Sequence, residues 1–473
     1  MNFLANSELP VAIIGAGPVG MAAAAHLIAR GMTPVLLECG RQVGASVADW
    51  GHVQLFSPWR YNIDSAAAKL LEETGWQRPD DDVVPTGRDL INAYLLPLAA
   101  HPKIAPALRL QATVEAVVRQ GRSRLGSEGR SDAPFDIVWR DTQGRRQRLT
   151  ARAVIDASGT WTDPNPMGLD GLPVEGEVEN ADRIAYGIPD VKGAASDVYA
   201  GKRVLVVGAG HSAINAVLDL LDLQDKAPNT KVYWATRNGG IARLLGGGLN
   251  DQLPGRGQLG LAAVAALKSG RLSLLSPYAA KEITRKAGGL TVSGELAGKA
   301  HRLEVDRIIV ATGFRPDLAP LRDLRLALDP IVEAPVALAT LIDPNLHSCG
   351  TVPPHGVVEI EHPEKDFFIA GMKSYGRAPT FLMATGYEQV RSIAAELAGD
   401  FVAARDVRLV LPETGVCSSD RITGVQSGCC GGPSDDAGAC CQLDAGSKAA
   451  GAEGCGCNSS RPKAANSCCA VPA

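Results

Sequence analysis

The sequence predicts an α/β protein of two parallel-sheet units, the second inserted into the first, followed by a disordered cysteine-rich tail. Three observations support this fold class. A pattern of strand, glycine turn, helix and strand occurs twice, over residues 11–38 and 201–237. Between the two patterns, residues from about 104 to 159 alternate in a β-rich manner, as in "FDIVWRD", and end in the apolar strand "ARAVIDASG"; a matching strand with a small-residue end, "DRIIVATG", follows the second pattern. No Phe, Tyr or Trp follows Phe401, and Gly, Ala and Ser dominate the end of the chain.

The first glycine turn directly follows the apolar strand "VAIIG". Gly15, Gly17 and Gly20 fit the spacing G-x-G-x-x-G, which lets backbone amides and a helix N-terminus meet a pyrophosphate. Glu38 ends the return strand "TPVLLE", where a carboxylate accepts hydrogen bonds from a ribose diol. The same carboxylate repels a 2′-phosphate, so this turn is predicted to hold FAD or NAD and to reject NADP.

The second glycine turn follows the strand "KRVLVV". Gly208, Gly210 and Ala213 fit the variant G-x-G-x-x-A, whose small third residue still permits close packing of helix and strand. The return strand "KVYWATR" ends in Arg237 with no carboxylate, and a guanidinium there pairs with a 2′-phosphate. The second unit is therefore predicted to prefer NADPH, and the chain to contain two Rossmann-like dinucleotide-binding domains.

Later apolar segments place the first domain on both sides of the second. The strand "DFFIAGM" and the helix "FLMATGYEQVRSIAAELAG" follow the second unit. We therefore expect an inserted domain and a tail too poor in apolar residues to fold. The predicted parts are the FAD-binding domain (1–165), the NADPH-binding domain (166–324), the second part of the FAD-binding domain (325–410) and the flexible tail (411–473).

Composition narrows the class of ligand. The chain has 473 residues, 47 basic and 51 acidic, giving a net charge of -4, and no basic run or basic helix face of the kind that binds nucleic acid. The first ten residues lack the features of a signal peptide, and no apolar run is long enough to span a membrane. We expect a cytoplasmic protein that acts on a small molecule, without nucleic-acid or membrane partners, and leave a homo-oligomer open.

The nested order of the two motifs resembles the flavoproteins with two dinucleotide-binding domains. Ala157-Ser158-Gly159 and Ala311-Thr312-Gly313 match that family's strand ends at the two crossings between domains, and Gly371 with the helix after Pro379 matches its late flavin element. The resemblance implies FAD in the first domain and NADPH in the second. It also implies that Gly313 and Gly371 contribute to cofactor binding.

An absence of cysteines indicates the branch of the family. Disulfide reductases carry a pair of neighbouring cysteines near the flavin, and this chain has none between Cys39 and Cys349. Without that dithiol, oxygen is the usual acceptor of the electrons. The block "WGHVQLFSPWRYN" lies where flavin monooxygenases place residues near the ring, although core packing remains an alternative for its aromatics. The candidates near the flavin are Trp50, Phe56, Trp59 and Asn62.

A closer resemblance concerns the substrate. The segments "PNLHSCGTVPPHG", "GMKSYGRAPTFLMATGYEQV" and "VLVVGAGHSAINA" resemble the flavin-dependent monooxygenases of bacterial arsenic-resistance operons. That resemblance implies NADPH- and oxygen-dependent oxidation of trivalent organoarsenicals to pentavalent forms. The segment after Gly176 lacks the F-x-G-x-x-x-H fingerprint of Baeyer-Villiger enzymes, which also favours a soft nucleophile over a carbonyl. The alternatives are an NADPH-dependent flavin reductase or dithiol oxidoreductase, and a metalloid-sequestering protein on a flavoprotein scaffold.

The tail is the most cysteine-rich part of the chain. Thiolates select soft, thiophilic centres, so the tail is interpreted as capturing arsenic or a soft metal. A redox relay to the flavin and a tail without a specific role are the alternatives, and adjacent cysteines argue against a zinc knuckle. Cys349 is a further candidate near the active site, with a buried unreactive thiol as its alternative. The candidate tail thiols are Cys429, Cys430, Cys440, Cys441, Cys455, Cys457, Cys468 and Cys469.

Overall fold

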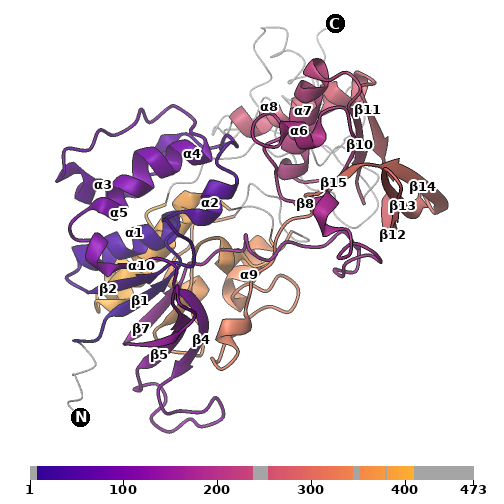
Figure 1. The fold of residues 1–473 in the computed structure, drawn as a ribbon. Helices are drawn as coiled ribbons and strands as arrows, with labels where there is room; N and C mark the ends of the chain where they lie inside the picture. The colour runs from indigo at the N-terminus through magenta and orange to yellow at the C-terminus, as the bar shows by residue number, and fades with distance from the viewer. Residues whose placement is uncertain (1–7, 238–253, 345–351, 379–380, 410–473) are drawn as a thin grey trace, which may run out of the picture. The chain divides into compact units, whose positions relative to one another are not determined.

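The computed structural model describes residues 8–237, 254–344, 352–378 and 381–409 (Figure 1). Contacts between residues divide the chain into two compact units. Unit 1 comprises residues up to Asn165 and resumes at Gly313, and unit 2 includes the intervening stretch from Pro166 to Thr312. Sequence analysis predicted the first boundary between the domains at the same position, after residue 165. It predicted the second boundary after residue 324, whereas unit 1 resumes at Gly313.

Unit 1 is built on a five-stranded parallel sheet in the order β16-β7-β1-β2-β3 (Figure 1). Val11 of the central strand pairs with Pro34 on one side and with Ala153 on the other. The central strand is buried along its length, as expected for a parallel sheet covered on both faces. The strands are β1 (Val11–Ile14), β2 (Pro34–Leu37), β3 (Leu108–Arg109), β7 (Ala153–Asp156) and β16 (Phe367–Ile369).

Two helices of unit 1, α1 (Pro18–Ala29) and α10 (Met383–Leu397), pack against each other (Figure 1). Pro18 stands at the first helical position of α1, where its missing N–H costs nothing. Gly386 permits the close packing, because a Cβ at that position would lie 2.5 Å from the Val19 side chain. The other helical segments of unit 1 are α2 (Ala45–Asp49), η2 (Trp59–Tyr61), α3 (Ser65–Glu72), α4 (Gly87–Leu90), η3 (Ile91–Leu95), α5 (Leu96–Ala100), η4 (Ala105–Ala107), η8 (Ala319–Leu321), α9 (Val336–Ile342), η9 (Val357–Ile360), η10 (Gly371–Tyr375) and α11 (Phe401–Arg405).

A second, antiparallel sheet of unit 1 is formed by β4 (Thr113–Arg119), β5 (Phe135–Arg140) and β6 (Arg146–Ala151). Its inner face joins the parallel sheet in one apolar core, where Phe135 and Phe367 face each other with ring centroids 6.4 Å apart. Sequence analysis predicted this β-rich stretch from its alternating pattern, and the structure confirms it.

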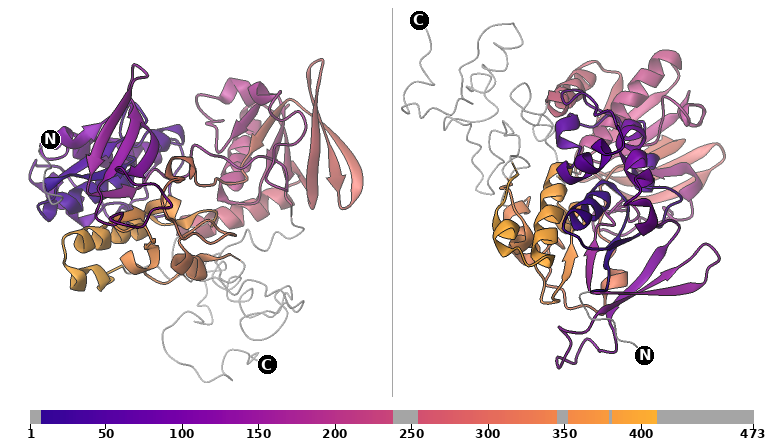
Figure 2. Two further views of the ribbon diagram at one scale, coloured as in Figure 1. Left: turned by 90° about the horizontal axis from the view of Figure 1, so that it is seen from below. Right: turned by 90° about the vertical axis from the view of Figure 1, so that its left-hand side faces the viewer.

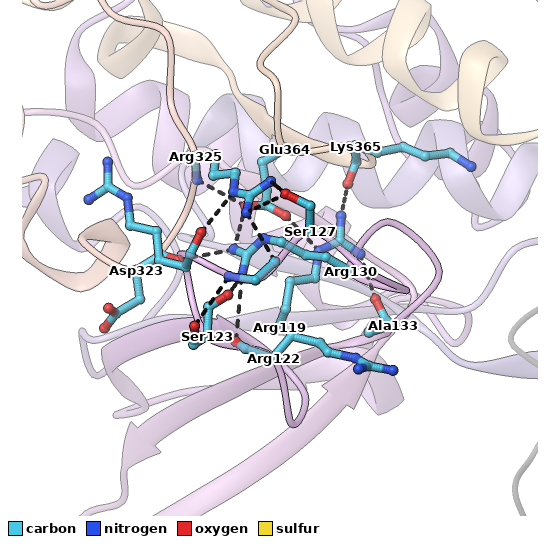
Figure 3. Close-up of polar contacts among 12 residues, drawn as sticks. Arg119, Arg122, Ser123, Ser127, Arg130, Ala133, Asp323, Arg325, Glu364 and Lys365 are labelled. Atoms are coloured by element: carbon cyan, nitrogen blue, oxygen red, sulfur yellow. Dashed lines mark hydrogen bonds and ion pairs between the residues drawn. The ribbon is translucent and has the colours of Figure 1, made fainter.

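A buried ion cluster ties the β4–β5 connection to the later part of unit 1 (Figure 3). The Glu364 carboxylate accepts hydrogen bonds from Arg119 Nε at 2.7 Å and Arg130 Nη2 at 2.6 Å. It also accepts one from the backbone N–H of Arg325 at 2.9 Å. The Arg119 guanidinium stacks on the Phe135 ring at 3.8 Å. The side chains of Arg119, Arg130 and Glu364 are all buried. The cluster therefore joins these segments of unit 1 by ion pairs inside the protein.

Unit 2 is built on its own five-stranded parallel sheet, in the order β11-β10-β9-β15-β8. Helix α7 (His211–Lys226) follows the second glycine turn and packs its apolar face on this sheet around Trp234, which is fully buried. The strands are β8 (Ile184–Tyr186), β9 (Arg203–Val207), β10 (Lys231–Ala235), β11 (Leu272–Leu275) and β15 (Arg307–Val310). The remaining helical segments of unit 2 are η5 (Ala181–Arg183), α6 (Ser196–Tyr199) and α8 (Pro254–Lys268).

Beside the parallel sheet, unit 2 carries a three-stranded antiparallel sheet that sequence analysis did not predict (Figure 2). Its strands are β12 (Tyr278–Lys286), β13 (Gly289–Leu296) and β14 (Lys299–Val305). Leu290 and Val292 of β13 and Val305 of β14 are buried in a core shared with β15. The fold class is thus confirmed as α/β with two parallel Rossmann-like sheets, and the predicted tail lies outside the described residues.

Candidate functional site

The glycine turn of unit 1 lies at the carboxyl end of β1. Gly15 has a φ of +94°, and a Cβ there would lie 2.8 Å from the carbonyl oxygen of Ala157. A Cβ on Gly20 would lie 2.0 Å from the carbonyl oxygen of Gly15. A Cβ on Gly17, in contrast, would meet no atom within 4 Å. Gly15 and Gly20 therefore close the turn, whereas the space at Gly17 is free for a ligand to approach the backbone.

Glu38 lies beneath this turn at the end of β2 and is almost fully buried. One of its carboxylate oxygens accepts from the N–H of Ala16 and the other from the N–H of Gly40, both at 2.7 Å. The oxygen that faces Gly40, Oε1, also accepts from the Cys39 thiol at 3.6 Å. The other oxygen, Oε2, keeps a second lone pair that can accept a hydrogen bond from a ribose. Burial and the neighbouring Glu38 raise the pKa of Cys39 to about 11, which makes that exposed thiol a poor nucleophile.

The two chain segments that lead into and out of unit 2 pair with each other within unit 1. The bridge between Pro164 and Phe314 is antiparallel, and Asn165 N donates to the Gly313 carbonyl oxygen at 2.9 Å. Gly313 has a φ of +92°, and a Cβ there would contact only the Asn165 side chain, at 3.5 Å. The small residue predicted at the crossing is thus required by the turn itself.

The late element predicted to contact the flavin, around Gly371, lies against the start of α1. Gly371 begins η10 with a φ of +70°, and a Cβ there would lie 3.3 Å from the Val19 side chain. Lys373, two residues on, makes a buried ion pair with Asp156, with Nζ 2.7 Å from Oδ2. Lys373 Nζ also donates to Ser158 Oγ at 3.0 Å. Hence η10 is joined by packing and by charge to the edge that carries the glycine turn.

The candidates of the aromatic block differ in exposure. Trp59 is only 4% exposed, and Asn62 is fully buried with its amide donating to the carbonyl oxygens of Ser57 at 2.7 Å and Pro58 at 3.0 Å. Trp50 and Phe56 are half-buried. Trp50 lies against Gly87, where a Cβ would meet its ring at 2.8 Å. Of the four candidates, Trp50 and Phe56 are thus the ones with exposed surface.

The glycine turn of unit 2 repeats the arrangement of the first. Gly208 has a φ of +140°, and a Cβ there would lie 2.2 Å from the Ala311 carbonyl oxygen. Ala213 is fully buried, and a Cβ on Gly210 would meet no atom within 4 Å. Arg237 follows β10 and is exposed. The open Gly210 backbone and the guanidinium lie at the carboxyl edge of the same sheet, as a nucleotide phosphate site requires.

Several candidates cannot be placed. Cys349 and the tail cysteines lie outside the described residues. In the described ranges, no group of three His, Cys, Asp or Glu side chains could hold a metal ion. No described helix is long and apolar enough to cross a bilayer.

Sequence reasoning missed two buried polar groups of unit 1. One is the Lys373 ion pair, whose only signal was a lysine within the otherwise small and apolar stretch "FFIAGMKSYG". The other is the contact between His355 and Gln389, both of them fully buried, with 3.0 Å between His355 Nε2 and Gln389 Nε2. A histidine in a proline-rich loop and a glutamine in a helix gave no sequence signal of this pairing.

Comparison with known proteins identifies the family. Residues 9–352 match the family model described as pyridine nucleotide-disulphide oxidoreductase. The chain belongs to this family. Members of the pyridine nucleotide-disulphide oxidoreductase family bind FAD and NAD(P), and these are the cofactors of this two-domain flavoprotein. The glycine turns, each with one open glycine backbone, fit those two dinucleotides.

Proteins that are similar to this chain carry names that describe different reactions. A ferredoxin–NADP reductase of Thermus thermophilus is 24% identical over 74% of this chain and 86% of its own. The indole-3-pyruvate monooxygenase YUCCA1 of Oryza sativa subsp. japonica is 30% identical over 44% of each protein. The bacillithiol disulfide reductase Bdr from Bacillus cereus shares the fold, with a TM-score of 0.62 and 20% identity over 83% of this chain and 99% of its own. The chain is therefore a flavin-dependent oxidoreductase with both reductase and monooxygenase relatives.

Proposed function

We propose that this protein is an NADPH- and oxygen-dependent FAD monooxygenase that oxidises a soft nucleophile, with trivalent organoarsenicals as its substrates. One observation carries the proposal. In a family named for disulphide chemistry, this chain has no cysteine between Cys39 and Cys349, so the domains lack a dithiol to receive the electrons. The similarity to a plant monooxygenase supports oxygen as the acceptor instead.

Unit 1 supplies the FAD site. The open backbone at Gly17 and the N-terminus of α1, which has no side-chain cap, receive the pyrophosphate. Glu38 accepts from the adenosine ribose, and the turn beginning at Gly371 borders the flavin. Trp50 and Phe56 shield the reacting region from water.

Unit 2 supplies the NADPH site. Gly208 and Ala213 set the close packing of the turn, and Gly210 lets the pyrophosphate approach. Arg237 pairs with the 2′-phosphate, which NADH lacks. FAD held by the glycine turn and Glu38 of unit 1 would supply the redox chemistry that links NADPH oxidation to oxygen.

The overall reaction balances without a dedicated acid/base pair. NADPH and one proton supply two electrons, one oxygen atom is bonded to the arsenic lone pair, and the other leaves as water. Trivalent arsenic becomes pentavalent, and NADPH becomes NADP⁺. The side chains therefore only bind, orient and exclude water, which fits a site without a catalytic dyad.

A second candidate is an NADPH-dependent flavin reductase or dithiol oxidoreductase that passes electrons to the C-terminal cysteines. The ferredoxin–NADP reductase relative, aligned over 86% of its own length, favours a reductase. A metalloid-sequestering protein on an inactive scaffold is the non-enzyme alternative.

Product analysis distinguishes the candidates. Purified full-length protein with FAD, NADPH and oxygen is incubated with methylarsenite, with a sulfide and with an amine in parallel. The proposal expects methylarsenite-stimulated NADPH and oxygen consumption with a pentavalent product, retained when the chain is cut after Pro412. Loss of turnover in the truncated chain favours the tail relay, and FAD binding without NADPH consumption favours sequestration. A protein that takes up no FAD refutes the proposal.

A further inference from the structure

A fully buried hydrogen-bond network connects the η10 turn with a histidine. Gln389 of α10 lies at its centre, His355 and Ser374 lie on either side, and all three side chains are fully buried. The N–H of Gly371 donates to Gln389 Oε1 at 2.8 Å. Gln389 therefore holds the first residue of the turn that packs against the start of α1.

The backbone N–H of Gly371 determines how the Gln389 amide is oriented. Ser374 Oγ can donate to the Gly371 carbonyl oxygen or, at 3.3 Å, to Gln389 Oε1, and either choice keeps Oε1 as an acceptor. Because Gly371 N–H requires an acceptor, the Gln389 oxygen must face it, and the amide nitrogen must face the other way. That nitrogen donates to Ser374 Oγ at 2.9 Å and lies 3.0 Å from His355 Nε2. Ser374 Oγ in turn donates to the Gly371 carbonyl oxygen at 2.8 Å.

These contacts determine the protonation state of His355. Its Nε2 must accept from the Gln389 amide, so it carries no hydrogen. Its Nδ1, 3.1 Å from the carbonyl oxygen of Pro353, must carry the hydrogen and donate it. His355 is thus neutral, in a single tautomer.

When His355 is protonated, no orientation of the Gln389 amide gives every buried donor an acceptor. The new Nε2–H would face the Gln389 NH₂ group, donor against donor. Flipping the amide would satisfy His355 but turn the NH₂ group toward the N–H of Gly371. A buried donor without an acceptor is strongly destabilising, so the proton and the present form of the turn exclude each other.

We infer that His355 and Gln389 are positioning residues for FAD: neutral His355, acting through the Gln389 amide, holds the Gly371–Tyr375 turn in its FAD-binding form, and a proton on His355 weakens FAD binding. The inference rests on the proposed placement of that turn at the flavin. Its structural support is the position of Gly371, where a Cβ would lie 3.3 Å from Val19 in the first turn of α1.

The surroundings of His355 are consistent with a neutral ring. Burial lowers the pKa of His355, against smaller effects of the Pro353 carbonyl and of the carboxylates of Glu359 and Glu388, which raise it. Glu388 is already paired with Arg391, with 2.6 Å between an oxygen and Nη2. The Tyr375 ring faces the histidine with centroids 5.8 Å apart.

The decisive variant is Gln389→Glu. A carboxylate can accept from Gly371 N–H with one oxygen and from a protonated His355 with the other. In this variant the network is therefore satisfied by protonated His355, whereas the wild-type network requires the neutral ring. FAD affinity of the full-length holoenzyme is measured by the fluorescence of released flavin between pH 5.5 and 8. We expect wild-type affinity to fall as the pH falls toward 5.5, by at most about tenfold per pH unit for one proton. We expect Gln389→Glu to bind FAD more tightly as the pH falls, and Gln389→Glu/His355→Gln to lose that dependence.

A second buried histidine of unit 1 provides the control. Burial lowers the pKa of His362 to about 4, and its ring contacts Phe367 and the N–H of Ala327 but no residue of the network. His362→Gln should keep the wild-type pH profile of FAD affinity. Circular dichroism checks that each variant is folded.

The outcomes separate this inference from the proposed function. If the wild type and His362→Gln bind FAD but Gln389→Glu follows the wild-type pH profile, the positioning role is wrong and the flavoprotein assignment stands. If no variant and no wild-type protein binds FAD, the proposed function itself fails.

Discussion

Lys373 and Asp156 form an ion pair inside unit 1, with 2.7 Å between Nζ and Oδ2 and side chains only 4% and 2% exposed. The pair joins η10 to the end of β7, the strand next to the one that carries the glycine turn. Asp156 also accepts from Ser158 Oγ at 2.6 Å, so its charge is compensated from two sides. The buried charge pair therefore fixes η10 to the strand beside the glycine turn.

Lys373→Met should destabilise the protein strongly, because it leaves the Asp156 carboxylate buried without its cation. We expect a loss of about 3 to 5 kcal/mol in the free energy of unfolding, measured by urea denaturation. Lys103→Met is the control, since Lys103 pairs with Glu73 at the surface, where solvent screens the pair and its contribution to stability is small. Equal losses in the two variants would contradict the structural role of the buried pair.

Glu364→Gln tests the cluster of Figure 3 and its dependence on pH. Although burial raises the pKa of Glu364, hydrogen bonds from Arg130, Arg119 and the Arg325 backbone hold it below the ordinary value of 4.5. A carboxyl whose pKa is lowered on folding stabilises the protein above its unfolded pKa, and this contribution is lost as the pH falls through the folded pKa. The variant should be less stable than wild type at pH 7, with a difference that shrinks below about pH 4.5. A difference independent of pH would contradict the charge-based explanation.

Cys39 should react slowly with iodoacetamide despite its exposure. With a pKa of about 11, about one thiol in a thousand is ionised at pH 8, against about one in ten for an ordinary thiol with a pKa of 9.0. Mass spectrometry of the Cys39 peptide measures the rate. The same peptide in urea-unfolded protein, where the thiol is hydrated and its hydrogen bond to Glu38 is lost, is the reference. Equal rates in the native and unfolded protein would contradict the effect of Glu38 and burial.

The sequence predicted those parts of the fold that depend on local pattern. The apolar runs at Val11–Ile14 and Arg203–Val207 are strands, and the glycines after them adopt positive φ, because turns of this geometry leave no room for a side chain. The sheet formed by β12, β13 and β14 was missed. Its strands are only partly buried and lack a long apolar run, so the pattern alone did not distinguish them from loops.

The polar contacts of the site could not be predicted, because they join residues far apart in the chain. Lys373 and Asp156 are separated by 217 positions, and only the sheet order places β16 next to β7. In the same way, the burial of Trp59 and Asn62 depends on the packing of the whole of unit 1. A sequence motif predicts the turn that contacts a ligand. The side chains that hold the turn in place lie in distant parts of the chain, so the motif does not predict them.

Arg237→Ala tests the coenzyme preference of unit 2. Loss of a charge-assisted hydrogen bond costs about 1.5 to 3 kcal/mol, so the KM for NADPH should rise by about tenfold to a hundredfold. The KM for NADH should stay unchanged, because NADH has no 2′-phosphate. Arg302→Ala, an exposed arginine on β14, is the control. If Arg237→Ala keeps the preference for NADPH, the 2′-phosphate is bound elsewhere.

Gly17→Ala and Gly20→Ala form a matched pair that separates cofactor contact from folding. A methyl group on Gly20 would lie 2.0 Å from the Gly15 carbonyl oxygen, so the turn must shift, and we expect a loss of about 1 to 3 kcal/mol in the free energy of unfolding of the apoprotein. A methyl group on Gly17 meets no atom within 4 Å and its φ is -75°, so the apoprotein should lose at most about 1 kcal/mol.

The Gly17 methyl group would nevertheless occupy the space through which the pyrophosphate approaches the backbone. Gly17→Ala should therefore weaken FAD binding by at least about tenfold, equivalent to about 1.4 kcal/mol. Urea denaturation of the apoprotein and titration with FAD measure the two effects separately. Normal FAD affinity in Gly17→Ala would mean that the pyrophosphate does not lie on this turn, since no atom of the described residues lies within 4 Å of the added methyl group.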